Sequence, residues 1–557
     1  LIGNLADNAN IFGIKPLKIF HASKLKLNER YGLAYHYIYT QNLDQKIGTP
    51  FYKLSNFNTT AISQFETGSL LNYISEYEGN ASFDVFLKQY FSEHYQKKVA
   101  GEDFLKSLEN HSKGKSSFLK KMMAEKHRIN FNLKSFDEAG QDYLVKINKN
   151  NAEIIPLKVE TEKKSGEKTT FWTQGNAVEN DSISVPENET NKIVLNDDYI
   201  FPETNFRDNY LYTKGLFSNM KKIRFKLIKD IQNPEYNEIF ITPRLTFNAY
   251  DKILFGMNFK NKGIFDQKFD YSVTPYYSSG TGKLTGSAGL GYAVLPPDSF
   301  FRSWNFGISG SYFHYDKDLA YKKFGASTSL NFNKDPRSAI GRSLYFGYNY
   351  YERELTPAMI LANEYAKYNL WNLGYAYSDN RMIHEQYIGT NVQWMEDFQK
   401  ISAEAFYRWE FAKNKKISFR WFAGYFVKNE TKNPLFDYGI SRVSNYSFSY
   451  GLLGQSATSG ILSQQFILAE GGFKSYFDTT VNQFITSFNV DSHLWKWFNL
   501  YADAGVYKNK NQSAQFIWDS GVKVKLIPDF LEIYFPVASS LGFEPSFKDY
   551  GYRIRYT

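Results

Sequence analysis

The second half of the chain, from about Ile239 to the end, is a series of segments in which apolar side chains alternate with small or polar ones. In residues 301–313, for example, Trp304, Phe306 and Ile308 fall on one face, and Asn305 and Ser309 fall on the other. Successive side chains of a β-strand point to opposite faces, so this alternation predicts strands with one apolar and one wet side.

About sixteen such segments follow one another, each about 10–15 residues long, with turn residues between them. A soluble β-sandwich also alternates, but open sheets rarely exceed about 10 strands. The segments have the length of tilted strands that cross a bilayer, and their polar faces carry the Ser, Asn, Gly, Lys and Arg expected of a wet lumen. The sequence therefore predicts a transmembrane antiparallel β-barrel of about 16 strands over residues 236–557, in the outer membrane of a Gram-negative bacterium.

The composition agrees with this prediction and excludes several classes of protein. Aromatic residues make up 18% of the chain, with 43 Tyr and 49 Phe, and such residues form the girdles of membrane barrels. No segment approaches the roughly 18 apolar residues of a spanning helix. The absence of cysteine excludes disulfides and thiolate chemistry, and the net charge of +9 is interspersed rather than gathered into a nucleic-acid-binding stripe. Because the chain opens at Leu1 without a methionine, we expect a processed form or part of a longer product.

The first part of the chain has a different pattern of apolar and polar residues. Residues 1–127 show apolar side chains at three- and four-residue spacing and are predicted to be helical. Residues 128–210 contain short alternating runs that predict a small antiparallel β-sandwich, and residues 211–235 form a linker. In outer-membrane barrels the short turns face the periplasm and the long loops face outside, so an even strand count predicts a periplasmic N-terminal domain.

The C-terminal segments resemble the sixteen-stranded barrels of the outer-membrane assembly-factor superfamily, also called surface-antigen barrels. The longest loop follows the eleventh segment and contains Ala-Glu-Gly-Gly-Phe-Lys-Ser-Tyr at residues 469–476. In that superfamily the corresponding loop carries a Val-Arg-Gly-Phe-type motif that folds back into the lumen. The resemblance implies that Gly471, Gly472 and Phe473 form the loop motif, with Gly471 in the place of the family's arginine. It covers about the last 130 residues.

The N-terminal part is similar to the C-terminal helices and β-sandwich of aminopeptidase-N-type (gluzincin) zinc metallopeptidases. The resemblance lies in residues 61–74, which begin Ala-Ile-Ser-Gln-Phe-Glu-Thr-Gly, in Phe-Asp-Val-Phe-Leu-Lys-Gln-Tyr-Phe at residues 83–91, and in Glu-Asp-Phe at residues 102–104. The family's zinc motif, His-Glu-x-x-His, is absent from this chain. The resemblance also implies that Phe65 stands where the family has the tyrosine that stabilises the oxyanion. A phenyl ring cannot donate that hydrogen bond, and loss of one oxyanion donor costs about 10²–10³ in rate.

These features predict an outer-membrane barrel with a periplasmic, catalytically inactive metallopeptidase-like domain, a pseudoenzyme that serves as scaffold or docking module in an assembly or secretion complex. Its expected partners are outer-membrane lipid and other outer-membrane proteins or lipoproteins, with no nucleic acid. No catalytic or metal-binding residue and no cofactor is predicted within this chain. One alternative is a membrane-anchored zinc aminopeptidase whose metal-binding segment lies upstream. Another is a barrel assembly or translocation factor, which requires a seam that can open between the first and last strands.

Overall fold

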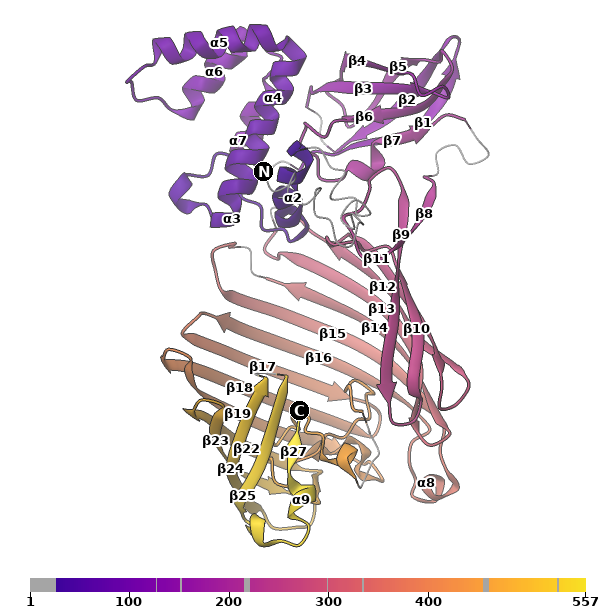
Figure 1. The fold of residues 1–557 in the computed structure, drawn as a ribbon, viewed down its shortest axis with the longest axis vertical. Coiled ribbons are helices and arrows are strands. Elements are labelled where there is room, and N and C mark those ends of the chain that lie inside the picture. The colour runs from indigo at the N-terminus through magenta and orange to yellow at the C-terminus, as the bar shows by residue number, and fades with distance from the viewer. Residues whose placement is uncertain are drawn as a thin grey trace, which may run out of the picture.

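The computed structural model describes residues 27–126, 128–150, 153–214, 221–297, 299–332, 335–453, 460–527 and 530–557, with side chains from residue 32 onward. A helical layer and a β-sandwich lie together above a large barrel (Figure 1). The helices are α2 (Leu27–Thr40), η3 (Phe51–Lys53), α3 (Asn56–Asn58), the π-helix η4 (Thr59–Glu66), α4 (Thr67–Glu78), α5 (Asn80–Glu93), α6 (Gly101–His111) and α7 (Phe118–Ala124). Among the described residues no helix is both long and apolar enough to cross a bilayer.

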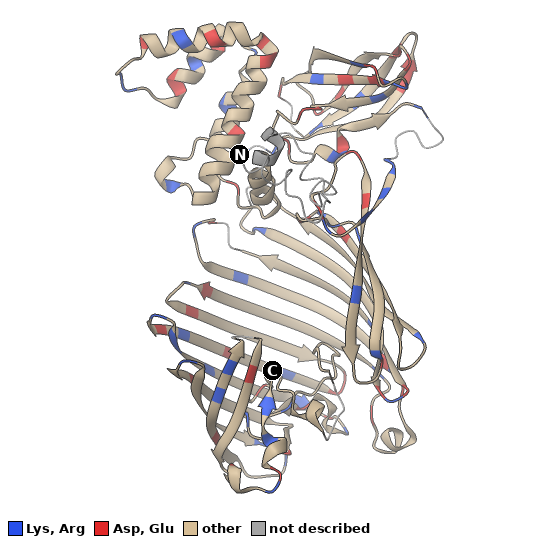
Figure 2. Ribbon diagram, in the orientation of Figure 1, with Lys and Arg blue, Asp and Glu red and all other residues tan. Residues whose placement is uncertain are grey.

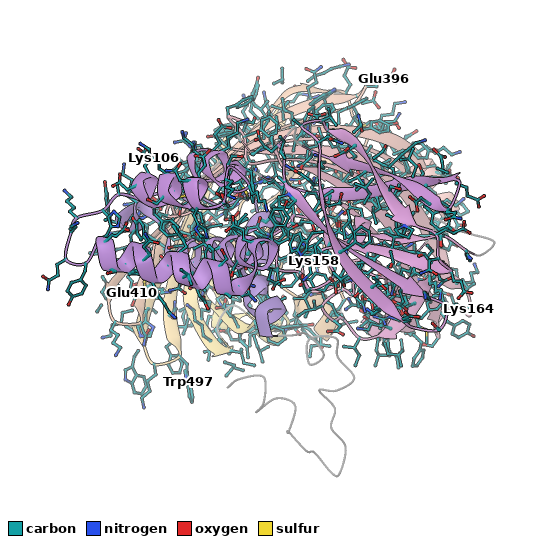
Figure 3. All side chains as sticks on the ribbon, turned by 90° about the horizontal axis from the view of Figure 1, so that it is seen from above. Lys106, Lys158, Lys164, Glu396, Glu410 and Trp497 are labelled. Atoms are coloured by element: carbon teal, nitrogen blue, oxygen red, sulfur yellow. The ribbon has the colours of Figure 1, made fainter. Side chains whose placement is uncertain are left out.

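The sandwich consists of two antiparallel sheets. One contains β1 (Phe131–Ala139), β2 (Asp142–Lys149) and β5 (Asn180–Pro186), and the other contains β4 (Lys168–Gln174), β3 (Pro156–Lys163), β6 (Thr190–Leu195) and β7 (Tyr210–Tyr212). A single hydrophobic cluster joins this sandwich to the helices: Tyr73 of α4 packs edge-on against Phe201, and its hydroxyl donates to the carbonyl of Pro156 at 2.6 Å. Viewed from above, Lys158 lies between the helices and the sheets (Figure 3), and its ammonium binds Glu76 of α4 at 2.8 Å. Helices and sandwich therefore form one module.

The barrel sheet is continuous and antiparallel over fifteen strands of nine residues or more in the described chain. These strands are β9 (Asn237–Asn248), β10 (Lys252–Lys260), β11 (Phe269–Ser278), β12 (Leu284–Val294), β13 (Ser303–Asp316), β14 (Leu319–Asn331), β15 (Ile340–Arg353), β16 (Lys367–Asn380), β17 (His384–Trp394), β18 (Phe398–Ala412), β19 (Lys415–Asn429), β22 (Phe484–Trp495), β23 (Phe498–Lys508), β24 (Gln515–Ile527) and β25 (Leu531–Ser539). The two-residue strand β27 (Arg555–Tyr556) pairs with β25 as the sixteenth. The prediction of a large antiparallel sheet with about 16 strands is thus confirmed.

The wall of the barrel has the predicted alternation. On β13, Trp304, Phe306 and Ile308 expose 39%, 39% and 49% of their surfaces, although they are large apolar side chains. Comparable residues recur on neighbouring strands, and the ribbons of β11 to β16 carry few charges along their middle parts (Figure 2). A continuous exposed apolar band of this kind indicates a wall that faces lipid.

The end of the chain differs from the sequence prediction. The alternating segments were expected to run to the end of the chain, but the structure has a short helix, α9 (Tyr550–Arg553), before β27. Only two residue pairs connect β27 to β25, Ile533 with Tyr556 and Tyr534 with Arg555. The strand pattern was too short there to compete with local helix and loop contacts.

The first strand also has an unexpected neighbour. Part of the predicted linker forms β8 (Ile223–Leu227), which pairs in parallel with residues 237–241 of β9. In strand order the ring returns from β27 through β8 to β9. No residue-by-residue ladder joins β27 to β8 or β9 in the part of the chain that the structure describes. We call this place between β27 and β9, where the described residues show no ladder, the seam.

The module contacts the connectors at one end of the barrel strands. Asn42 of the module donates to the carbonyl of Pro296 between β12 and β13 at 2.9 Å, and Gln41 donates to Asp266 between β10 and β11 at 2.7 Å. The two long connectors, residues 354–366 and 430–483, leave from the opposite strand ends. The module therefore caps the strand ends opposite to the two longest connectors.

Candidate functional site

The long connector between β19 and β22 lies inside the barrel. We call its described residues, 430–453 and 460–483, the lumen loop. Its two ends pair with each other as β20 (Tyr438–Gly439) and β21 (Thr480–Val481). Aromatic and aliphatic residues of the loop and of the inner wall form one buried cluster: Tyr351, Tyr368, Leu370, Phe398, Phe422, Phe426, Phe436, Tyr438, Ile440, Tyr446, Phe473, Phe477, Val481 and Ile485. The lumen near the loop is therefore packed, whereas the sequence suggested a wet lumen throughout.

The three residues predicted as the loop motif lie at the centre of this packing. Phe473 is fully buried, and it fits against Gly505 of β23, where an added Cβ would come within 3.1 Å of the ring. Gly472 has φ +74°, and a Cβ there would lie 2.8 Å from the guanidinium of Arg420. The amide of Gly471 donates to the carbonyl of Gly439 at 2.9 Å. A positive φ combined with this close approach explains why glycine is required at residue 472.

A buried ion pair holds the loop directly after this motif. The ammonium of Lys474 lies 2.8 Å from Oδ1 of Asp503 on β23, and the two side chains are 9% and 0% exposed. The backbone amides of Lys474 and Ser475 both donate to Oδ2 of Asp519 on β24, at 2.9 and 2.5 Å. The cation of this buried pair is thus Lys474, one residue past Phe473, whereas the predicted loop motif ended at Phe473.

A second cation reaches the loop from the wall. Arg420 of β19 is 8% exposed and binds Glu404 of β18 through Nε at 2.6 Å. Its Nη1 donates to the backbone carbonyl of Glu470 and to Oδ1 of Asn489, both at 3.0 Å. The pattern of the sequence placed Arg420 on a strand but offered no signal for this contact, because its partners are distant in the chain.

The lumen loop also binds the last strand of the barrel. Gln465 forms a parallel bridge with Tyr556, and the amide of Phe466 donates to the carbonyl of Tyr556 at 2.6 Å. The side chain of Gln464 donates to the carbonyl of Ile554 at 2.7 Å. Arg555, which is 4% exposed, donates to the carbonyl of Ser441 at 2.6 Å. Loop backbone therefore occupies the edge of β27 that faces away from β25.

In the module, Phe65 is a packing residue. Its ring lies 6.1 Å from that of Tyr35, and the tip of the ring faces Gly32, where an added Cβ would lie 2.8 Å from Cζ. Phe65 also lines an open cavity of about 1480 Å³ between the module and the barrel mouth. Burial lowers the pKa of Lys221 in this cavity to about 7, and nearby Arg207 acts in the same direction.

The described histidines do not assemble a metal site. His94 stacks on Tyr90, and burial lowers the pKa of His36, which contacts Phe265, to about 4. His384 binds the hydroxyl of Tyr407, whereas its neighbour Glu385 pairs with an arginine. Within the described ranges no group of three or more His, Asp or Glu side chains is arranged to hold a metal ion. The residues present therefore do not fit the zinc site of the resembled peptidases. The remaining histidines are at residues 21, 111, 127, 314 and 493, of which 21 and 127 lie outside the described residues.

Comparison with known proteins gives a distant match in fold. No protein-family model matches the sequence, and no curated protein matches it. Among solved structures, BamA from Haemophilus ducreyi lacking POTRA domains 1–3 is similar over 56% of this chain and 70% of that chain, with 9% sequence identity and a TM-score of 0.32. The resemblance of the N-terminal part to metallopeptidases stays a prediction. With so low a TM-score, function has to be inferred from the geometry of the chain itself.

Proposed function

We propose that this chain is an outer-membrane barrel that acts on other polypeptides, in assembly or secretion, and that its module is a docking scaffold on the periplasmic side. The observation that carries this proposal is a pair of features at the barrel. The lumen loop is held by the buried ion pair of Lys474 with Asp503 and by a hydrogen bond from Arg420 of the wall, whereas the seam between β27 and β9 has no ladder in the described residues.

A packed lumen is not expected of a barrel that functions as a passive diffusion channel. Such channels are open, with polar walls, as in porins. Here Lys474 of the loop binds Asp503 of the wall. From the wall, Arg420 donates to the carbonyl of Glu470 and Lys400 donates to the carbonyl of Phe436, at 3.0 and 2.9 Å. Removing one partner of a buried pair of this kind costs about 3–5 kcal/mol, because the other charge is then left uncompensated.

The unpaired strand edge at the seam favours a polypeptide as the substrate. Unpaired backbone groups are costly in lipid, and a strand edge satisfies them by pairing with another strand. Residues 237–241 of β9 are covered by β8, but residues 242–248 pair only with β10 among the described strands. Leu245 in that stretch exposes 71% of its surface. An extended segment of a client could therefore add to β9.

A scaffold role for the module agrees with the surroundings of Phe65. Because the tip of its ring faces Gly32, the side chain fills space and leaves little room for a hydroxyl group. The second candidate is an aminopeptidase whose zinc ligands lie on an upstream segment. Zinc content and aminopeptidase turnover of the purified full-length product distinguish the two: turnover that depends on zinc would overturn the scaffold role.

The seam is tested by photocrosslinking in cells. A benzoylphenylalanine replaces Leu245, which lies in the part of β9 that pairs only with β10 among the described strands. The same group at Ile308, 49% exposed in the middle of the wall, is the matched control. We expect crosslinks to other outer-membrane proteins from Leu245 and none from Ile308. Equal crosslinking at both sites, or none at Leu245, would refute the role of the seam.

A further inference from the structure

The module presents large aromatic side chains beside the barrel rim. Phe51 and Tyr52 of η3 each expose 73% of their surface, and Phe57 of α3 exposes 48%. We call these three residues, with Lys53, the rim patch. Single exposed apolar residues are common on soluble surfaces, but adjacent aromatic rings that project this far mark an interaction site.

The rim patch is held rigidly from beneath. The side chain of Gln45 donates to the carbonyl of Lys53 at 3.0 Å and accepts from the amide of Ser55 at 2.9 Å. Ser55 in turn caps α3 by accepting from the amide of Asn58 at 3.2 Å. Leu54, between the patch and this cap, is buried. The aromatic rings are therefore presented by a fixed turn.

The patch lies next to the lipid-facing wall. Arg337, in the turn between β14 and β15, donates to the carbonyl of Tyr52 at 3.0 Å. In Figure 1, α3 projects from the helical layer toward the turn ends of these strands. The neighbouring turn carries Phe300, which is 76% exposed and stacks on Phe332 at 6.2 Å. Aromatic residues at this level form the girdle of a membrane barrel, and the patch continues it.

The chemistry of the patch suits a lipid headgroup layer. Phe and Tyr rings settle at the membrane interface, and a lysine beside them reaches the anionic phosphates. Lys53 is exposed and lies 5.8 Å from the ring of Tyr52, so cation and rings face the same surroundings. Three projecting rings offer far less area than the roughly 800 Å² per partner of a stable protein interface. A lipid surface, which extends without limit beside the barrel, is the better fit.

We propose that the rim patch inserts into the headgroup layer of the leaflet on the module side, and so gives the module a membrane contact of its own. Together with the contacts to the barrel turns, this second contact fixes the tilt of the module over the barrel mouth. It requires only that the barrel spans a membrane, and not that the barrel acts on polypeptides.

The test uses the full chain in nanodiscs of phosphatidylethanolamine and phosphatidylglycerol. Because the chain has no cysteine, Tyr52→Cys carries a single environment-sensitive NBD label, and Tyr95→Cys, 75% exposed at the far end of α5, is the matched control. Lipids with a doxyl quencher near the headgroup should quench the label at residue 52 and leave the label at residue 95 unaffected. Lys53→Glu should weaken the quenching at residue 52.

Three outcomes would overturn the proposal. The first is equal quenching at the two sites, and the second is quenching of the label at residue 52 by aqueous iodide alone. The third is a blue-shifted label at residue 52 that doxyl lipid does not quench, which would place a protein, such as a second copy of this chain, on the patch. Loss of crosslinking at Leu245 would leave this proposal intact, so the two tests are distinguishable.

Discussion

Replacing Lys474 by methionine removes the cation that anchors the lumen loop and keeps most of the length of the side chain. The bond to Asp503 is 2.8 Å long and almost fully buried, so its loss leaves an uncompensated carboxylate inside the barrel. Removing one partner of such a pair costs about 3–5 kcal/mol. At a factor of ten for each 1.4 kcal/mol, the population with a released loop should rise roughly a hundred- to four-thousandfold.

The assay is single-channel conductance in planar bilayers, where release of the loop appears as openings of the barrel. Lys432→Met, at an exposed position of the same loop, is the matched control. The double variant Lys474→Met with Asp503→Asn should open less often than Lys474→Met alone, because the orphaned charge is gone. If Lys474→Met opens no more often than Lys432→Met, the ion pair does not hold the plug and the reasoning is wrong.

Three further outcomes are expected. Burial raises the pKa of Glu203 from 4.5 to about 8, so its contribution to folding is full below about pH 4.5 and is lost as pH rises toward 8; Glu203→Gln should flatten this dependence in thermal melts. Phe65→Tyr should destabilise the module by about 1–3 kcal/mol in chemical denaturation, because the new hydroxyl meets Gly32. Arg128→Ala, which removes a buried contact to a barrel turn, should speed chymotryptic cleavage of the junction, and the exposed Arg381→Ala should not.

Period-two alternation was enough to predict the barrel wall. Residues such as Trp304 and Phe306 carry that signal locally, because lipid on one side and a lumen on the other act on every strand in the same way. The same signal counted strands well enough to find the longest loop after the eleventh one, β19. It failed at Tyr552, where contacts with the loop decide the conformation.

The contacts of the lumen loop could not be predicted from the sequence. Lys474 and Asp503 are 29 residues apart, and nothing in the spacing shows that they meet. The motif of Gly472 and Phe473 correctly indicated the buried part of the loop. It did not indicate that Lys474, three residues after Gly471, is the cation that anchors it. The pairing of β8 with β9 was also missed, since a parallel strand within a linker has no distinct pattern.

The bridge from Gln465 to Tyr556 couples release of the lumen loop to movement of β27 at the seam. A force that moves β27 away from the barrel wall also pulls on the middle of the lumen loop. A ligand that displaces the lumen loop removes a hydrogen-bonded neighbour from β27. By thermodynamic reciprocity, each change must favour the other by the same free energy. Release of the loop would then lower the midpoint of opening at the seam, and opening at the seam would lower the midpoint of loop release by the same free energy.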